Sequence, residues 1–179
     1  MLIPRHKTPA LSLPKVGGGS FDLDRDAGER GTLVVFYRGL HCPICAKQLS
    51  ELEDHADAFA ERGIAMVAVS GDGEERARGM VEKAGTKKLA VVHGLTLAQA
   101  REWGLLISTG RGKTSAGIDE PERFSEPGLF LVNPDRTLYF EVVQSMPFTR
   151  PSADALLTAL DFAIEKNYPA RGEYTGPVD

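Results

Sequence analysis

Residues 32–45, TLVVFYRGLHCPIC, are the stretch that decides the fold and the chemistry of this chain. The apolar run from Leu33 to Tyr37 is typical of a strand that is buried on both faces. Cys42 and Cys45 follow this run closely and are the only two cysteines among 179 residues. Because helical spacing of apolar residues begins directly after them, the sequence predicts a strand that delivers both cysteines to the first turn of a helix.

The start of a helix is a favourable place for a reactive cysteine. The reactive species is the thiolate, and the free N–H groups and positive dipole end of a helix N-terminus stabilise a negative sulfur. We expect Cys42 at the N-cap and Pro43 as the first helical residue, where its missing N–H costs nothing. Cys45 shares an apolar stripe with Leu49 and Leu52, so we expect it to be more buried. This asymmetry suits an exposed, attacking Cys42 of lowered pKa and a sheltered, resolving Cys45.

The composition is that of an ordinary globular protein, with 42% apolar and 26% charged residues. A net charge of -4 and a pI near 5.6 argue against a nucleic-acid partner. No apolar run is long enough to cross a membrane, and residues 1–7 lack the apolar segment of a secretory signal. We therefore expect a cytoplasmic protein without a membrane partner, in which a CxxC pair is catalytic or metal-binding rather than structural.

A zinc site is the alternative role for the cysteine pair. Zinc takes four ligands, and only His6, His41, His55 and His93 could complete the set. No second CxxC exists in the sequence. We therefore expect no metal and no cofactor, and we interpret the pair as a redox dithiol.

The rest of the chain predicts a single α/β domain over residues 1–179, with a mixed sheet and helices on both faces. Irregular tails are expected at residues 1–7 and 167–179. An N-terminal hairpin is expected around the turn Gly17-Gly18-Gly19. Further strands are expected over 64–69, 89–92, 129–132 and 138–143, the last two joined by a turn at 133–136.

Helices are expected at four places, and one segment is expected to be irregular. The first helix carries an apolar stripe from Cys45 to Phe59 and is closed by Gly63. The others are expected over 74–83, from Thr96 to Trp103, and after an N-cap at Ser152. Residues 107–126 are polar and rich in glycine, so we expect a long loop, which in a compact domain is often functional.

The segment FYRGLHCPIC at residues 36–45 resembles the F-Y-P-x-x-x-T-x-x-C motif of peroxiredoxin-like proteins, the alkyl hydroperoxide reductase and thiol-specific antioxidant group. In this register Arg38 replaces the motif proline, Cys42 replaces the motif threonine, and Cys45 falls on the peroxide-reacting cysteine. The resemblance covers roughly residues 8–166. It implies a thioredoxin-like three-layer sandwich.

A second segment, PGLFLVN at residues 127–133, resembles the R-G-L-F-I-I-D strand of the same family. Pro127 stands where a peroxiredoxin would have its active-site arginine, and where thioredoxins place a cis-proline against the disulfide. The threonine and arginine that help a peroxiredoxin bind peroxide are thus replaced, whereas a CPxC and a candidate cis-proline are present. We predict from this that Pro127 is cis and lies against Cys42 and Cys45.

Two further residues are candidates for a supporting role. His41 as an imidazolium could lower the thiol pKa or shuttle a proton, or it could be an exposed surface residue. Arg38 ends the buried strand and could stabilise a thiolate or orient a substrate oxygen, or it could be an ordinary charge at a strand end.

Three functions follow from these observations. The leading one is a thiol-disulfide oxidoreductase that uses Cys42 and Cys45. The alternative is an antioxidant thiol peroxidase, in which one cysteine becomes a sulfenic acid and the other resolves it. A non-catalytic redox sensor is the third. The expected partners are a protein or small-molecule disulfide, or a peroxide, together with a thiol reductant, and an oligomer is possible. On the leading interpretation, peroxide reduction is slower than disulfide exchange and depends on Arg38.

Overall fold

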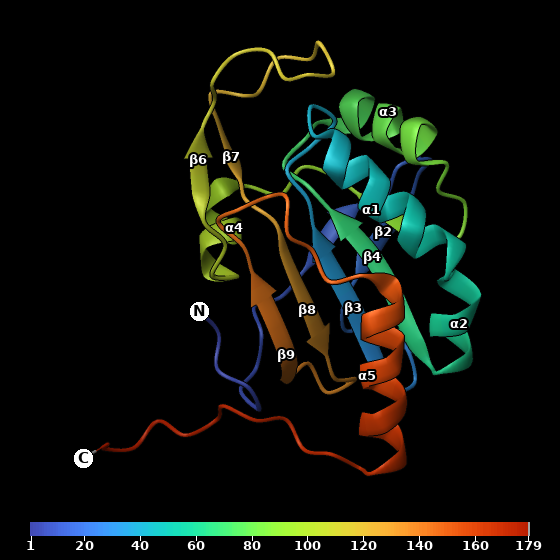
Figure 1. The fold of residues 1–179 in the computed structure, drawn as a ribbon, viewed down its shortest axis with the longest axis vertical. Helices are drawn as coiled ribbons and strands as arrows, with labels where there is room; N and C mark the ends of the chain where they lie inside the picture. Colours follow the sequence, from blue (N-terminus) through green and yellow to red (C-terminus); the bar gives the residue numbers. More distant parts are fainter. Residues whose placement is uncertain (179) are drawn as a thin grey trace.

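A five-stranded mixed sheet forms the centre of the computed structural model, which describes residues 1–178 (Figure 1). The strands are β1 (Ser12–Pro14), β2 (Ser20–Asp22), β3 (Gly31–Phe36), β4 (Ile64–Val69), β5 (Ala90–Val92), β6 (Ile107–Thr109), β7 (Arg123–Ser125), β8 (Gly128–Val132) and β9 (Leu138–Val143). The helices are α1 (Pro43–Asp54), α2 (Ala56–Glu61), α3 (Glu74–Ala84), α4 (Leu97–Glu102) and α5 (Ala153–Glu165).

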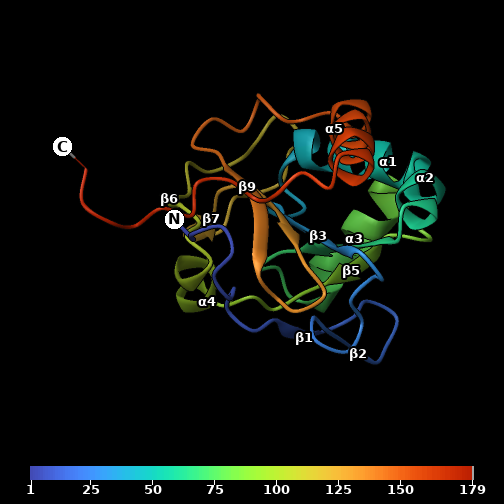
Figure 2. The same ribbon diagram turned by 90° about the horizontal axis from the view of Figure 1, so that it is seen from below.

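The order of strands in the central sheet is β5-β4-β3-β8-β9, with β3 in the middle. β3 runs parallel to β4 and antiparallel to β8. Helices α1, α2 and α5 lie on one side of the sheet, and α4 lies on the other side with the β1–β2 hairpin (Figure 2). The expected three-layer, thioredoxin-like sandwich with an N-terminal hairpin is therefore confirmed.

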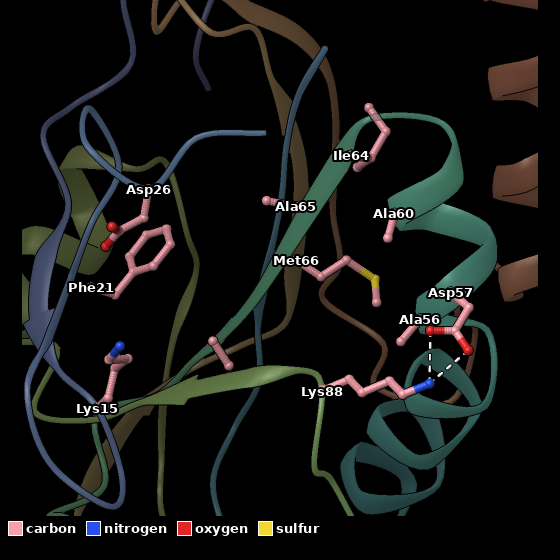
Figure 3. Close-up of a pocket in the computed structure, with 11 residues that line it drawn as sticks. Lys15, Phe21, Asp26, Ala56, Asp57, Ala60, Ile64, Ala65, Met66 and Lys88 are labelled. Atoms are coloured by element: carbon pink, nitrogen blue, oxygen red, sulfur yellow. Dashed lines mark hydrogen bonds and ion pairs between the residues drawn. The ribbon is translucent and has the colours of Figure 1, made fainter. Parts of the chain in front are cut away.

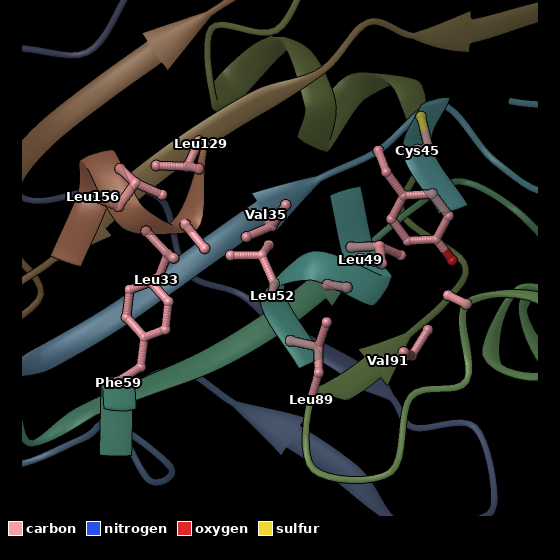
Figure 4. Packing of buried hydrophobic residues seen from close by; sticks show 14 of the residues in the cluster. Leu33, Val35, Cys45, Leu49, Leu52, Phe59, Leu89, Val91, Leu129 and Leu156 are labelled. Carbon is pink, nitrogen blue, oxygen red and sulfur yellow. The ribbon is translucent and has the colours of Figure 1, made fainter. Parts of the chain in front are cut away.

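Strand β3 supplies both halves of the core, as its apolar sequence predicts. All six of its residues are buried, and successive side chains of a strand point to opposite faces. Leu33 and Val35 join a cluster with side chains of α1, α2 and α5 (Figure 4). Phe36 points to the other face, where its ring lies 5.1 Å from that of Trp103 and 5.5 Å from that of Phe130.

The helix after the cysteines is shorter than the sequence predicts. Its apolar stripe continues to Phe59, but α1 ends at Asp54, and α2 begins after His55. His55 leaves the helical conformation because its own side chain takes the carbonyl of the preceding turn: Nδ1 donates to the Glu51 oxygen at 2.8 Å. The backbone N–H of His55 donates to the Leu52 oxygen instead. Phe59 still reaches the same core, which is why the periodicity continues across the break.

Residues 107–126, which the sequence predicts to be a long loop, contain a two-stranded sheet. β6 and β7 pair in antiparallel register, with Ser108 opposite Phe124. Their polar, glycine-rich sequence carries no alternation of apolar residues, so the strands were not predictable from periodicity. The residues between the two strands extend beyond the central sheet at the top of Figure 1. We call residues 107–125 the β6–β7 hairpin.

The two ends of the chain carry no helix or strand in the residues that the structure describes. The N-terminal segment is nevertheless attached to the sheet, because the Arg5 N–H donates to the Leu138 oxygen at 2.8 Å. Residues 167–178 follow α5 as an irregular segment, and Asp179 lies outside the described residues. No helix within residues 1–178 has the length and apolar character that crossing a membrane requires.

Replacing Phe130 with alanine should lower the free energy of unfolding by about 3–5 kcal/mol, because it removes a fully buried ring and leaves a cavity. Phe140→Ala in β9 is the control, since that ring is partly exposed and its loss should cost about 1 kcal/mol or less. Urea unfolding followed by the fluorescence of Trp103, the only tryptophan, measures both variants. If both variants lose the same free energy of unfolding, the cluster of Phe36, Trp103 and Phe130 is not central to stability.

Candidate active site at the start of α1

Cys42 and Cys45 lie at the start of α1 in the arrangement that the sequence predicts. Cys42 is the N-cap residue, with extended backbone angles of φ -103° and ψ 101°, and Pro43 is the first helical residue. The Cys42 sulfur accepts a hydrogen bond from the backbone N–H of Cys45 at 3.3 Å. The same N–H also donates to the Cys42 carbonyl oxygen at 3.1 Å, so this donor of the first helical turn is shared between the oxygen and the sulfur.

Cys42 is more enclosed than expected, whereas Cys45 is buried as predicted. The exposed fraction is 2% for Cys42 and 0% for Cys45, so the expectation of an exposed Cys42 is wrong. Cys42 packs into the apolar core cluster, and the β6–β7 hairpin and residues 145–148, whose position the sequence did not predict, line the space next to it. Both cysteines belong to the apolar core cluster, but only Cys42 also lines a cavity, of about 660 Å³.

The environment separates the pKa values of the two thiols. A hydrogen bond from the Cys45 thiol, a second one from the Cys45 N–H, and the charges of Arg150 and Arg38 lower the pKa of Cys42 to about 6, against the opposing effect of burial. Burial, followed by the neighbouring Cys42, raises the pKa of Cys45 well above its ordinary range. Near neutral pH the pair therefore holds one thiolate, on Cys42, and one thiol, on Cys45.

Arg150 is the site residue that sequence reasoning missed. Its Nη2 donates to the Cys45 sulfur at 3.3 Å, and its Nε donates to the Pro147 oxygen at 2.8 Å. Its Nη1 also bonds Oε1 of Gln48, a buried side chain of α1. The sequence offered only a weak signal, an arginine just before the N-cap of α5, with no spacing that links it to a cysteine 105 residues away. A guanidinium therefore faces the dithiol, although position 127 has none.

Pro127 does not have the predicted role. No peptide bond in residues 1–178 is cis, so the prediction of a cis-proline is wrong. Pro127 does not line the cavity around Cys42. Its carbonyl oxygen accepts a hydrogen bond from the Gln144 N–H at 3.0 Å, which extends the β8–β9 pairing by one step. This residue therefore belongs to the sheet, as a proline at a strand entry can.

Arg38 connects the end of β3 to the β6–β7 hairpin. Its Nη2 donates to Glu120 at 2.9 Å, its Nε lies 3.4 Å from Glu126, and its guanidinium stacks 4.6 Å from the centre of the Phe124 ring. The charge of Arg38 contributes to the lowered pKa of Cys42. Arg38 thus holds the hairpin over the site, because its acidic and aromatic partners all come from that region of the chain.

His41 is fully buried, so the interpretation as an exposed residue is wrong. Burial first, and then the charge of Arg38, lower its pKa to about 4, so it is neutral at neutral pH and does not act on the thiols as an imidazolium. Its Nδ1 lies 3.4 Å from Nη2 of Arg76, which Asp72 anchors at 3.0 Å. Because arginine only donates, Nδ1 accepts and the ring proton is on Nε2.

The other features of the structure do not compete with the dithiol. No cluster of three or more His, Cys, Asp or Glu side chains suited to a metal ion occurs in residues 1–178. A second cavity, of about 360 Å³, lies between the N-terminal hairpin and α2 (Figure 3). Its Lys88 is already paired with Asp57, and neither cysteine reaches it. The nucleophilic chemistry of the described residues is therefore concentrated at the start of α1.

A buried strand, a CxxC at a helix N-terminus and a mixed sheet define a thioredoxin-like thiol oxidoreductase. The AhpC/TSA family model matches residues 4–140 of the sequence, and the chain belongs to this family. The protein is accordingly an oxidoreductase that acts on peroxide or disulfide. No curated protein sequence gave a significant match.

Solved structures share the fold at low sequence identity. Peroxidoxin BcpB from Mycobacterium tuberculosis is 19% identical with a TM-score of 0.70, and the match covers 90% of this chain and 98% of that one. Mycobacterium tuberculosis AhpC is 16% identical with a TM-score of 0.73, over 94% and 96% of the two chains. Reduced Prx3 from Vibrio vulnificus, in complex with hydrogen peroxide, is 14% identical with a TM-score of 0.68, over 89% and 99%.

The ultraviolet absorbance of the thiolate should rise with pH in two separated steps, the first near pH 6, since Cys42 ionises first. In Cys45→Ala the first step should move to higher pH, because the hydrogen bond from the Cys45 thiol is the largest cause of the lowered pKa. In Cys42→Ala only a step above the ordinary thiol range should remain, because Cys45 is buried. If Cys42→Ala still forms a thiolate near pH 6, the lowered pKa belongs to Cys45 and our assignment to Cys42 is wrong.

Proposed function

We propose that this chain, as one domain, is a thiol peroxidase in which Cys42 attacks the peroxide and Cys45 resolves the product. The observation that carries the proposal is the contact between the two sulfurs and their donors. The Cys45 N–H bonds the Cys42 sulfur at 3.3 Å, and Arg150 bonds the Cys45 sulfur at 3.3 Å. One sulfur is thereby prepared as a thiolate that faces a cavity, and the other as a thiol that holds a proton beside a cation.

The reaction follows from these protonation states. The Cys42 thiolate attacks one peroxide oxygen, the O–O bond breaks, and Cys42 becomes a sulfenic acid while hydroxide or alkoxide leaves. Cys45 gives its proton to the leaving oxygen, and Arg150 stabilises the resulting thiolate. This thiolate attacks the Cys42 sulfur, the disulfide forms, and the sulfenic oxygen leaves as hydroxide. With hydrogen peroxide, one thiolate and one thiol thus become a disulfide, one water and one hydroxide.

Two findings favour peroxide over generic disulfide exchange as the main reaction. The first is membership of the AhpC/TSA family. One structure of similar fold, reduced Prx3 from Vibrio vulnificus, is in complex with hydrogen peroxide. The second is Arg150, whose charge lowers the pKa of Cys42 and whose Nη2 donates to the Cys45 sulfur, so that it stabilises both the attacking and the resolving sulfur as thiolates. The sequence interpretation favoured disulfide exchange because position 127 carries no donor. Arg150 supplies a cation beside the dithiol from another segment, although it does not line the cavity around Cys42.

The cycle needs a thiol reductant that returns the disulfide to the dithiol. A reducing compartment such as the cytoplasm suits this step, since small and protein thiols are maintained there. Turnover with a thiol reductant distinguishes the peroxidase from a redox sensor, which would be oxidised once without turnover. A comparison of the rate constants for hydrogen peroxide and for a small disulfide distinguishes it from a disulfide exchange enzyme. We expect peroxide to react faster.

The two single-cysteine variants test which sulfur attacks. Cys45→Ser should still consume one equivalent of hydrogen peroxide and should accumulate a sulfenic acid on Cys42, because the resolving thiol is absent. Cys42→Ser should react slowly, because the pKa of Cys45 is raised. Trapping of sulfenic acid with a dimedone-type reagent and mass spectrometry locates the label. A rapid sulfenic acid on Cys45 in Cys42→Ser would mean that the family register holds and that Cys45 attacks.

Replacing Arg150 with alanine should lower the second-order rate constant for hydrogen peroxide by about 100-fold, the usual cost of one such donor. Arg150→Lys should recover part of this rate because it keeps the charge. Arg78→Ala is the matched control, an exposed arginine of α3 that bonds only Glu74. Stopped-flow oxidation of the three variants at one pH gives the comparison. A wild-type rate in Arg150→Ala would remove Arg150 from the proposed mechanism.

A further inference from the structure

The cavity over Cys42 is much larger than a peroxide needs. Its volume is about 660 Å³, whereas one water occupies roughly 30 Å³ of the liquid, and a hydrogen peroxide molecule is only slightly larger than a water. Cavities of about 300–1,000 Å³ are typical of sites for organic ligands. The extra space comes from the β6–β7 hairpin and from residues 145–148, which together form the cover of the site.

The charges of this cavity are arranged to attract an anion. Its two carboxylates, Glu120 and Glu126, have side chains that are 8% and 7% exposed, and both pair with Arg38. Arg111 and Lys113 line the cavity from the hairpin, and no carboxylate within residues 1–178 pairs with either side chain. The cavity therefore presents two free cations at its exposed side, in a protein whose net charge is -4.

The remaining wall combines hydroxyl and apolar groups. Ser115 and Ser145 offer hydroxyls, and Phe148, at 73% exposure, and Pro147 offer apolar surface. Amides and carboxylates of a short peptide suit such a wall better than a plain hydrocarbon chain does. Cys42 is only 2% exposed beneath the hairpin, so a small molecule can reach its sulfur through the cavity more readily than the flat surface of a protein can.

We propose that this cavity binds the reductant, a low-molecular-weight peptide thiol whose carboxylate pairs with Arg111 and Lys113 while its sulfur meets Cys42. The inference rests on the proposed function, in which a disulfide of Cys42 and Cys45 must be reduced. The reductant thiolate attacks the Cys42 sulfur, the Cys42–Cys45 bond breaks, and Cys45 leaves as a thiolate beside Arg150. A second reductant thiol attacks the mixed disulfide, which releases the disulfide of the reductant and restores the Cys42 thiolate, while the protons of the two thiols pass to Cys45 and to solvent.

The test measures reduction of the disulfide that a chemical oxidant has formed in advance, so that it does not depend on reaction with peroxide. The probes are glutathione, which carries carboxylates, and 2-mercaptoethanol, which carries no charge. In Arg111→Gln/Lys113→Gln the rate with glutathione should fall by about 10-fold, the loss expected of two exposed ion pairs. The rate with 2-mercaptoethanol should stay unchanged. Lys83→Ala/Lys87→Ala is the control, since both are exposed lysines that do not line the cavity.

Three results would overturn the inference. The first is an equal rate with glutathione in wild type and in the Arg111/Lys113 double variant. The second is a rate with thioredoxin that exceeds the rate with glutathione and is unaffected by the double variant. The third is a double variant that is slow only in oxidation by a carboxylate-bearing hydroperoxide, which would assign the cations to the substrate. Failure of the proposed function has a different signature: slow oxidation by hydrogen peroxide in every protein, with the glutathione effect intact.

Discussion

The hydrogen bond from the Cys45 N–H to the Cys42 sulfur is the interaction on which the site depends. A buried thiolate is costly unless donors replace the water that it loses. The start of α1 provides such a donor only if Cys42 is extended and the helix begins at Pro43. The turn that arranges this needs Gly39, whose φ is 136° and whose missing Cβ would lie 2.8 Å from Asp72. The rest of the fold can be understood as what holds this turn in place.

Strand β3 and Arg38 fix the two sides of the turn. β3 is pinned between β4 and β8, so it ends at a defined point below α1. Arg38 then holds the β6–β7 hairpin next to the site by pairing with Glu120 of the hairpin and with Glu126, the residue that follows it. Such a buried ion pair is weak evidence for stability, because desolvation offsets much of the attraction. The pairing matters here because it positions the hairpin, which lies next to Cys42 and carries Arg111 and Lys113 to the cavity.

The predictable parts of this molecule are those with a local signal. The apolar run of β3 and the proline after Cys42 set the local backbone conformation by themselves. The strand, the N-cap and the difference in pKa between the cysteines therefore follow from the sequence. Arg150 approaches Cys45 across 105 residues, and Glu120 approaches Arg38 across 82, and neither contact leaves a periodic pattern.

The predictions that the structure contradicts also have physical explanations. The likeness of residues 127–133 to a strand of the family aligned a motif but contained no information on the backbone geometry at Pro127. One hydrogen bond from a His55 side chain ended α1 within an unbroken apolar stripe. The burial of Cys42 was not predictable, because the hairpin near it is polar and glycine-rich, and burial by such a segment leaves no signature in hydrophobic periodicity.

Titration of the reduced protein with hydrogen peroxide, with the remaining thiols counted and the intact mass recorded, tests the central claim most directly. We expect one equivalent of peroxide to remove both thiols, the protein to form no intermolecular disulfide, and its mass to fall by two hydrogens. Loss of only one thiol per peroxide, covalent dimers, or thiols that persist in peroxide while a small disulfide oxidises them rapidly would contradict it.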